Sequence, residues 1–216
     1  MKVAAFVPIK LNSQRVKNKN ILPLGGRPLC WHVFHALLRA EGIDEVYCYC
    51  SDEAIREYIP NEAIFLKRDP ALDGQLVKGF DIYERFIQDV DADIYVLCHA
   101  TSPFIRAETI ARGVRAVREE GYDSAFSAQR VQTFAWYQGK PINYDINDVP
   151  RTQELEPVFV ETSAFFIFQK DVFVKHRRRI GFHPYICETG DVESIDIDEP
   201  EDYEFACKLA EGVFGK

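Results

Sequence analysis

Several motifs that often reveal an enzyme's chemistry are missing from this chain of 216 residues. It has no G-x-x-x-x-G-K phosphate loop, and no G-x-G-x-x-G turn follows its first apolar segment, which argues against a nicotinamide-dependent enzyme. It also has neither a G-x-S-x-G nucleophile elbow nor an H-E-x-x-H zinc motif. Because no protein nucleophile stands out, the sequence fits a reaction in which the substrate brings its own nucleophile.

An excess of basic charge and a long apolar run are also lacking. The net charge is −8, so the chain as a whole is expected to be a poor nucleic-acid binder. No run approaches the ~18 apolar residues of a membrane span, and Met1 leads into an apolar strand without a signal-peptide layout. We therefore expect a cytoplasmic protein. With no repeat, low-complexity tract or linker, residues 1–216 are expected to form a single domain.

The cysteines lack the spacing of a zinc site. Cys48 and Cys50 would share one face of a strand, but no second pair at zinc spacing accompanies them. We therefore expect buried, reduced structural thiols. The six are Cys30, Cys48, Cys50, Cys98, Cys187 and Cys207.

What the sequence does contain is a regular alternation of strand and helix patterns. The strand candidates are Val3–Ile9, Glu45–Cys50, Ala63–Leu66, Ile94–Cys98, Ser124–Ala128, Thr162–Phe168 and Ser194–Ile197. The helix candidates are Leu29–Ala40, Asp52–Tyr58, Gln75–Asp89, Ala107–Glu120, Lys170–His176 and Pro200–Gly212. The first and fourth strands are nearly all apolar, which is typical of strands covered on both faces. The alternation predicts an α/β fold with a mainly parallel sheet and helices on both sides.

One stretch, residues 132–160, breaks this alternation. It carries the aromatic residues Phe134, Trp136, Tyr137 and Tyr144 and has no clear helix pattern. A floppy loop of this length is uncommon inside a compact domain, and aromatic side chains that leave one core usually pack on another surface. We interpret the stretch as an excursion, in the form of a hairpin, that packs on a second copy of the chain.

A basic loop follows the first strand. Lys10, Arg15, Lys17 and Lys19 lie within ten residues, at the carboxyl end of an apparently buried strand. In open α/β sheets, ligands bind outside the carboxyl ends of the strands. Cations crowded there repel one another unless an anion neutralises them, so the loop indicates a polyphosphate site. The alternative is a basic loop exposed to solvent.

An acidic segment lies near the end of the chain. Asp196 and Asp198 alternate with Ile195 and Ile197, so on a strand both carboxylates would project from one face. Mg²⁺ typically takes one or two carboxylates and completes its shell with water and substrate phosphates. Alternatively, Asp198 caps the helix that begins at Pro200, which would leave Asp196 for a metal.

Two further regions carry polar side chains. His99 could face a base or a sugar at the tip of the fourth strand, while Thr101 or Ser102 could cap the following helix. The clusters 151–153 and 161–163 adjoin the aromatic excursion and could line a substrate pocket. We interpret the basic run 175–179 as a solvated helix end, with contact to a phosphate or sugar acid as the lesser alternative.

Together these segments resemble the acylneuraminate (sialic acid-type) cytidylyltransferases, which activate acidic 2-keto-3-deoxy sugars. Family members open with a strand and a motif like A-R-x-x-S-[KT]-x-[LI]-P-x-K-N. Ser13, Lys19 and Asn20 match it, Lys10 replaces the usual arginine, and Arg15 matches the arginine of the related keto-deoxyoctulosonate branch.

The resemblance continues along the rest of the chain. The family's [QP]-P-T-S-P segment is similar to His99–Pro103, and its R-Q-x-L stretch to Arg151–Leu155. Its N-G-A-[IF]-Y motif is similar to Thr162–Phe166. The terminal S-I-D-I-D is matched in full by Ser194–Asp198, at the family's position near the end of the chain.

The resemblance implies a three-layer α/β/α Rossmann-like fold of the GT-A nucleotidyltransferase type, a homodimer joined through the excursion, CTP as co-substrate and Mg²⁺ as cofactor. The reaction would join CTP and a keto-deoxy sugar acid into a CMP-sugar and pyrophosphate. The resemblance gives catalytic roles to Lys10, Arg15, Lys19, Asp196 and Asp198, of which the two aspartates would also bind the metal. The residues that would bind the nucleotide are Asn12, Ser13, Asn20, His99, Thr101 and Ser102. The residues that would bind the sugar acid are Arg151, Gln153 and Thr162.

Three alternatives stay open at this point. One is a nucleotidyltransferase of the same architecture that acts on a sugar phosphate or polyol phosphate. Another is a glycosyltransferase with a D-x-D pair, although that pair usually lies in the middle of the chain. The third is a protein of this fold that binds a nucleotide without catalysis.

Overall fold

The fold is built on a seven-stranded sheet with the order β11-β7-β10-β6-β1-β4-β5. The computed structural model describes residues 1–11 and 16–214. Strand β10 runs antiparallel to both of its neighbours, while the other pairs in the sheet are parallel. The strands are β1 (Val3–Ile9), β4 (Glu45–Cys50), β5 (Ile64–Lys67), β6 (Ile94–Cys98), β7 (Ser124–Val131), β10 (Val158–Gln169) and β11 (Pro184–Thr189). The predicted mainly parallel α/β sheet is confirmed.

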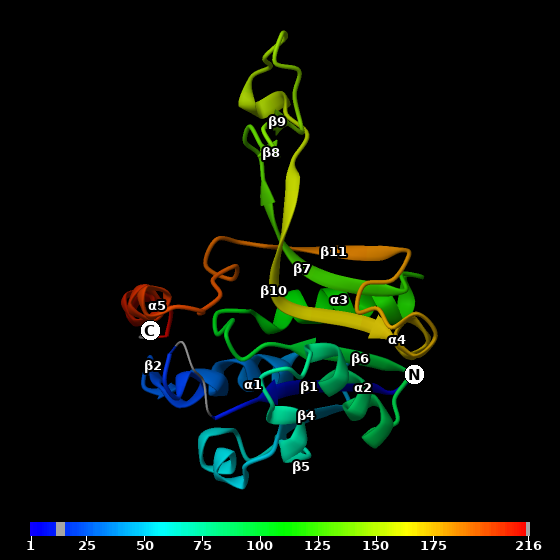
Figure 1. The fold of residues 1–216 in the computed structure, drawn as a ribbon, viewed down its shortest axis with the longest axis vertical. Coiled ribbons are helices and arrows are strands. Elements are labelled where there is room, and N and C mark those ends of the chain that lie inside the picture. Colours follow the sequence, from blue (N-terminus) through cyan, green and yellow to red (C-terminus); the bar gives the residue numbers. More distant parts are fainter. Residues whose placement is uncertain (12–15, 215–216) are drawn as a thin grey trace.

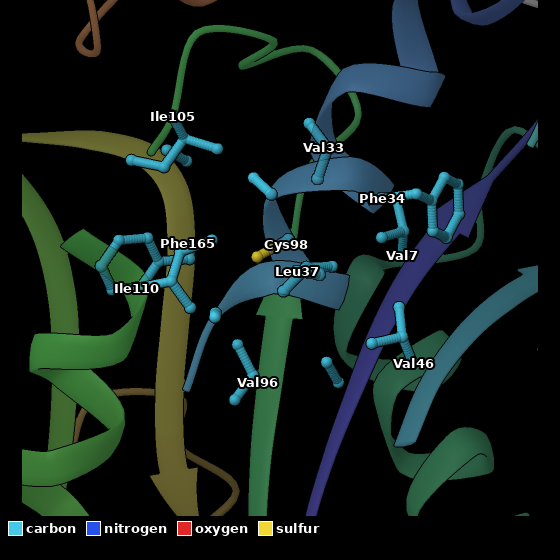
Figure 2. Close-up of a cluster of buried hydrophobic side chains, with 14 of the residues drawn as sticks. Val7, Val33, Phe34, Leu37, Val46, Val96, Cys98, Ile105, Ile110 and Phe165 are labelled. Carbon is cyan, nitrogen blue, oxygen red and sulfur yellow. The ribbon is translucent and has the colours of Figure 1, made fainter. Parts of the chain in front are cut away.

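Helices cover both faces of this sheet (Figure 1). Alternate residues of β1 face opposite sides, because side chains on a strand point up and down in turn. Val7 belongs to the cluster beneath α1 (Leu29–Arg39) and α3 (Ala107–Glu119), drawn in Figure 2. Phe6 stacks on Phe86 of α2 (Gly79–Asp89) with ring centroids 4.1 Å apart, on the side that also carries α4 (Lys170–His176). The sheet therefore forms the middle of three layers.

The cysteines behave as expected for structural thiols. All six are unpaired, and five are buried, with Cys207 partly exposed. Cys48 and Cys50 both join the cluster beneath α1. Burial raises the pKa of the Cys30 and Cys187 thiols to about 12, so both stay protonated and inert at neutral pH.

An arm projects from the body of the molecule between β7 and β10 (Figure 1). We use this name for residues 129–160, which begin and end with paired β7 and β10 residues. The arm also holds β8 (Trp136–Tyr137), β9 (Lys140–Pro141) and the short 3₁₀ helix η4 (Thr152–Glu154). Strands β8 and β9 pair as an antiparallel hairpin. Seven large apolar side chains of the arm are 37–66% exposed: Trp136, Tyr137, Ile142, Ile146, Val149, Phe159 and Val160.

The predicted strand Ser194–Ile197 is wrong. Its backbone is irregular, with turn bonds from Ser194 N to Gly190 O and from Ile195 N to Val192 O. The place beside β7 is taken by β11, and Ile197 N donates to the carbonyl oxygen of Thr101, in the loop after β6, and not to a neighbouring strand. The sequence pattern misses β11 because its first three residues are only half-buried.

The remaining elements connect these layers. Predicted helix Asp52–Tyr58 is the 3₁₀ helix η2 (Glu53–Tyr58), and the helix predicted from Gln75 begins at Gly79. The last helix, α5 (Pro200–Val213), packs on a small hairpin formed by β2 (Pro23–Leu24) and β3 (Arg27–Pro28). The two remaining short elements are the 3₁₀ helices η1 (Lys19–Ile21) and η3 (Pro70–Asp73). Within the described part of the chain, no helix has the length and apolar character needed to cross a membrane.

Candidate functional site

A cavity of about 660 Å³ opens at the carboxyl edge of the parallel strands. Residues that follow β1, β5 and β6 line it, together with η1 and the start of α2. Its polar lining includes Lys10, Lys19, Asn20, Arg68, Asp73, Tyr83, His99 and Thr101. A second cavity, of about 760 Å³, lies between α1 and η2 and contains none of the residues predicted for the site.

Five predicted residues meet at the first cavity: Lys10, Lys19, Asn20, His99 and Thr101. Ser102, in contrast, is buried and does not line the cavity, and its hydroxyl has no hydrogen-bond partner within residues 1–11 and 16–214. Neither Thr101 nor Ser102 caps α3, whose N-cap residue is Arg106. The predicted residues Asn12, Ser13 and Arg15 lie outside the described residues.

Hydrogen bonds hold the described parts of the basic loop in place. Asn20 Nδ2 donates to the carbonyl oxygen of Lys10 at 2.8 Å. Lys10 Nζ in turn donates to the carbonyl oxygen of Asp73 at 3.0 Å. These bonds fix where the Lys10 ammonium lies, which is what a group that binds phosphate requires.

Lys19 links the first loop to the acidic segment near the end of the chain. Its side chain is only 10% exposed, and its Nζ lies 3.3 Å from Asp198 Oδ1. It also donates to the carbonyl oxygen of Ile197. Ile197 N donates to the carbonyl oxygen of Thr101 at 2.9 Å, so the acidic segment is attached to the end of β6 as well.

The acidic segment fits a divalent cation. Asp196 Oδ1 is buried without a hydrogen-bond partner among the described residues, and a carboxylate oxygen left in this way is costly. The same residues hold no cluster of three or more His, Cys, Asp or Glu side chains arranged for a metal. Asp196 and Asp198 would suit Mg²⁺, which needs only one or two carboxylates and fills its shell with water and phosphate oxygens.

The alternative role for Asp198, as cap of α5, is wrong. The N-cap residue of α5 is Glu199, and the carboxylate of Asp202 accepts from the backbone N–H groups of Asp198 and Glu199 at 3.0 and 2.8 Å. The carboxylate of Asp198 instead lies beside Lys19. Asp198 thus lies close to a cation that lines the cavity.

Arg68 was not predicted from the sequence, yet it organises the floor of the cavity. Its side chain is fully buried and donates to the carbonyl oxygens of Ile9, at 2.7 Å, and Tyr49, at 3.0 Å. It also pairs with Asp73 Oδ1 at 2.6 Å, and Ser51 donates to the same carboxylate. Arg68 therefore connects the ends of β1, β4 and β5 to the segment around Asp73, whose carbonyl oxygen accepts the hydrogen bond from Lys10. The available signal was a cation directly after a strand, as at Lys10.

His99 lies on another wall of the cavity. Its Nε2 is 3.4 Å from the hydroxyl of Tyr83, and its ring meets Phe166 edge-on, with centroids 6.1 Å apart. Desolvation lowers the pKa of His99, while the charge of nearby Asp196 opposes that shift. His99 thus lies between the acidic segment and the start of α2.

The basic run 175–179 is not simply a solvated helix end. Arg179 is only 29% exposed, and its guanidinium carbon lies 3.7 Å from the centroid of the Phe166 ring. The interpretation is therefore wrong for Arg179, which reaches the neighbourhood of His99.

The residues predicted to bind the sugar lie elsewhere. Arg151 and Gln153 are on the arm, where the Arg151 side chain is 80% exposed and pairs with Glu154. The cavity has no lining residue from the arm of the same chain. Thr162 is buried at the base of the arm, and its hydroxyl donates to Ser127 Oγ at 2.9 Å.

Comparison with known proteins gives a consistent result. A family model described as cytidylyltransferase matches residues 4–214. The N-acylneuraminate cytidylyltransferase of Streptococcus agalactiae serotype III (strain NEM316) is 23% identical over 94% of this chain and 52% of its own length. N-acylneuraminate cytidylyltransferase A of Danio rerio is 26% identical over 99% of this chain and 52% of its own length. The chain thus spans about half the length of these two relatives. The CMP-N,N'-diacetyllegionaminic acid synthase of Legionella pneumophila is 24% identical, over 98% of this chain and 97% of its own length.

Solved structures show the same fold. A CMP:2-keto-3-deoxy-manno-octonic acid synthetase complexed with CTP has a TM-score of 0.74 at 18% identity, covering 99% of this chain and 100% of its own. The 4-diphosphocytidyl-2C-methyl-D-erythritol synthase of Anaerococcus prevotii has a TM-score of 0.66 at 12% identity, covering 97% and 96%. At these identities the likeness concerns the fold, and it confirms the predicted α/β class.

Proposed function

The chain belongs to the cytidylyltransferase family, and from this premise we propose that it transfers a cytidylyl group from CTP to an acidic 2-keto-3-deoxy sugar. The family assignment confirms the resemblance found in the sequence. The observation that carries the proposal is that Lys10 and Lys19 line one cavity, while the segment of Asp196 and Asp198 adjoins it through the contact of Lys19 with Asp198 and the bond of Ile197 N to Thr101 O. Phosphate-binding cations and metal-binding carboxylates are the two groups that such a transfer needs in one place.

In the proposed reaction, the anomeric hydroxyl of the sugar acid attacks the α-phosphorus of CTP. A phosphorus–oxygen bond forms to the sugar, the bond to the β-phosphate oxygen breaks, and pyrophosphate leaves. Catalysis of this kind depends mostly on positioning and on neutralising charge. Lys10 and Lys19 would neutralise the phosphates, with Arg15 as a third cation. Asn20, through its bond to the Lys10 carbonyl, keeps that part of the loop in position.

Asp196 and Asp198 would hold Mg²⁺ in this scheme. Bound Mg²⁺ supplies positive charge to phosphate oxygens and lowers the pKa of a hydroxyl group that contacts it. Lys19 pairs with Asp198 and donates to Ile197 O, so it fixes the carboxylates relative to the basic loop. His99 and Thr101 line the same cavity, where they would contact the nucleotide.

We further propose a homodimer in which the arm of one copy covers the cavity of the other. The support is the exposed apolar surface of the arm, which is unusual for a monomer. Arg151 and Gln153 lie on the arm, so this arrangement would bring them to the sugar acid, which they do not reach in their own chain.

Sedimentation of arm variants tests the dimer. Trp136→Ser combined with Ile142→Ser removes two of the exposed apolar side chains and should give monomers that bind CTP but turn over sugar acid poorly. Val174→Ser is the control, because Val174 is 61% exposed on α4 and lies outside both the arm and the cavity lining. A double variant that sediments like wild type and keeps its turnover would contradict the proposed dimer.

Pyrophosphate release tests the reaction itself. Wild type should release pyrophosphate when given CTP, Mg²⁺ and one of N-acetylneuraminate, N,N'-diacetyllegionaminate or 3-deoxy-manno-octulosonate, and not with the other nucleotides. Lys19→Met should bring release close to background, because it removes a buried cation of the site. Release that requires a sugar 1-phosphate instead would favour the related nucleotidyltransferases, and CTP binding without release from any acceptor would favour a non-catalytic protein.

A further inference from the structure

Three successive arginines follow α4, and each is used differently. Arg177 pairs with Asp81 and Glu84 on α2 at 2.6 and 2.7 Å. Arg178 lies over the ring of Phe182, a side chain that is itself 66% exposed. Arg179 turns toward the body of the protein. The ion pairs of Arg177 hold the segment against α2 and so fix the direction in which Arg179 points.

Arg179 lies flat against a buried aromatic surface. Its guanidinium carbon is 3.7 Å from the centroid of Phe166, whose side chain is fully buried. The carboxylate of Glu161 lies 3.6 Å from its guanidinium, which is longer than a hydrogen bond. A guanidinium stacked in this way keeps its N–H donors at the edge of its plane, where they can form a bidentate pair with a planar anion.

Arg179 also adjoins two residues of the cavity. Burial raises the pKa of Tyr83, and Arg179 opposes that rise by its charge and a hydrogen bond. The charge of Arg179 likewise acts on His99, which also senses Asp196. Arg179 therefore lies next to His99 and Tyr83, which line the cavity, although it is not itself a lining residue.

We infer that Arg179 binds the carboxylate of the acceptor and so selects sugar acids over neutral sugars. This inference rests on the proposed function. In a 2-keto-3-deoxy acid the carboxylate is bonded to the anomeric carbon that also bears the attacking hydroxyl. A carboxylate held at Arg179 would therefore place that hydroxyl near Asp196, where the metal and the α-phosphate are proposed to meet.

The test compares each acid with its neutral methyl ester. Wild type should release pyrophosphate from CTP with N-acetylneuraminate or 3-deoxy-manno-octulosonate, and much more slowly with the corresponding methyl ester. Arg179→Met keeps the packing of the stem on Phe166 but removes the charge. It should lower kcat/KM for the acid by about 10- to 100-fold, which matches the loss of a charge-assisted hydrogen bond, and leave the ester unchanged. The shift in unfolding temperature with CTP should stay at the wild-type value.

Two further variants make the test specific. Arg178→Met removes the neighbouring cation and should keep the wild-type ratio of acid to ester. Arg179→Lys keeps the charge but loses the planar guanidinium, so its ratio of acid to ester turnover should fall between those of wild type and Arg179→Met. If Arg179→Met does not fold, the ratio measured for Arg179→Lys tests the inference instead.

Three outcomes would overturn the inference. The first is a wild-type acid-to-ester ratio in Arg179→Met or, if that variant does not fold, in Arg179→Lys. The second is an equal loss of CTP binding and acid turnover, which would indicate a general structural role. The third, a wild-type protein that binds CTP but activates none of N-acetylneuraminate, N,N'-diacetyllegionaminate and 3-deoxy-manno-octulosonate, would overturn the proposed function and this inference with it.

Discussion

Replacing Arg68 should destabilise the protein far more than replacing its exposed neighbour. Arg68→Met leaves two backbone carbonyl oxygens and the carboxylate of Asp73 without the hydrogen bonds that Arg68 donates to them. Because the Arg68 side chain is fully buried, water cannot replace all three donors. Breaking a buried pair by removing one partner costs ~3–5 kcal/mol. Asp73 is 32% exposed and can be partly rehydrated, so we expect a loss of about 3 kcal/mol.

For a chain of this length, 1 kcal/mol corresponds to roughly 2–4 °C in unfolding temperature, so Arg68→Met should unfold roughly 10 °C below wild type. Lys67→Met is the matched control, because Lys67 is 62% exposed and its pair with Glu53, at 3.4 Å, is worth about 0–1 kcal/mol. Urea unfolding followed by circular dichroism measures both variants. A loss in Arg68→Met within 1 kcal/mol of that in Lys67→Met would refute the role given to the buried network.

The remaining predictions address the metal site, the core and the pH dependence of stability. Asp196→Asn should reduce turnover at least 100-fold, as expected for the loss of a group that stabilises transition-state charge. Its unfolding temperature should stay at or above that of wild type, because the buried oxygen without a partner no longer carries a negative charge. Gly113→Ala should cost about 1–3 kcal/mol in urea unfolding, since the new Cβ would lie 2.8 Å from Ile167 Cδ1. Burial alone would raise the pKa of Glu193, but hydrogen bonds, led by that from Arg106, bring it below its ordinary value of 4.5. The ionised Glu193 therefore stabilises the protein above pH 4.5, and this stabilisation is lost as pH falls through the lowered pKa. The difference in unfolding free energy between wild type and Glu193→Gln should be constant at neutral pH and shrink only below pH 4.5.

The fold was predictable where a single segment carries its own signal. The bounds of β1, β4, β6 and α4 match the structure, because continuous apolar runs and a short amphipathic helix are local features. Strand β11 was missed because an edge strand with half-buried residues has no such run. The alternation at Ser194–Ile197 did predict the burial of Ile197, but not the backbone, because the N–H groups there bond within local turns and to the carbonyl oxygen of Thr101.

The sequence predicted several charged residues of the site, but not Arg68 and Arg179, which surround them. Lys10 and Lys19 could be placed at this edge because ligand sites lie outside the carboxyl ends of the strands. The two aspartates were expected there as part of a strand; that strand is absent, yet Asp198 still lies beside Lys19. Arg68 and Arg179 could not be grouped with them in the same way. Their roles depend on which side chains and carbonyls the tertiary structure places around them, and in sequence both belong to ordinary basic stretches.

The measurement that tests the account most directly is thermal unfolding with each of CTP, UTP, ATP and GTP, with and without Mg²⁺. A ligand at about 100 times its dissociation constant adds ~2.7 kcal/mol of stability. The account predicts the largest shift with CTP, a further increase when Mg²⁺ is added, and no Mg²⁺-dependent increase in Asp196→Asn. Equal shifts with all four nucleotides, a larger shift with a purine nucleotide, or no shift at all would contradict the account.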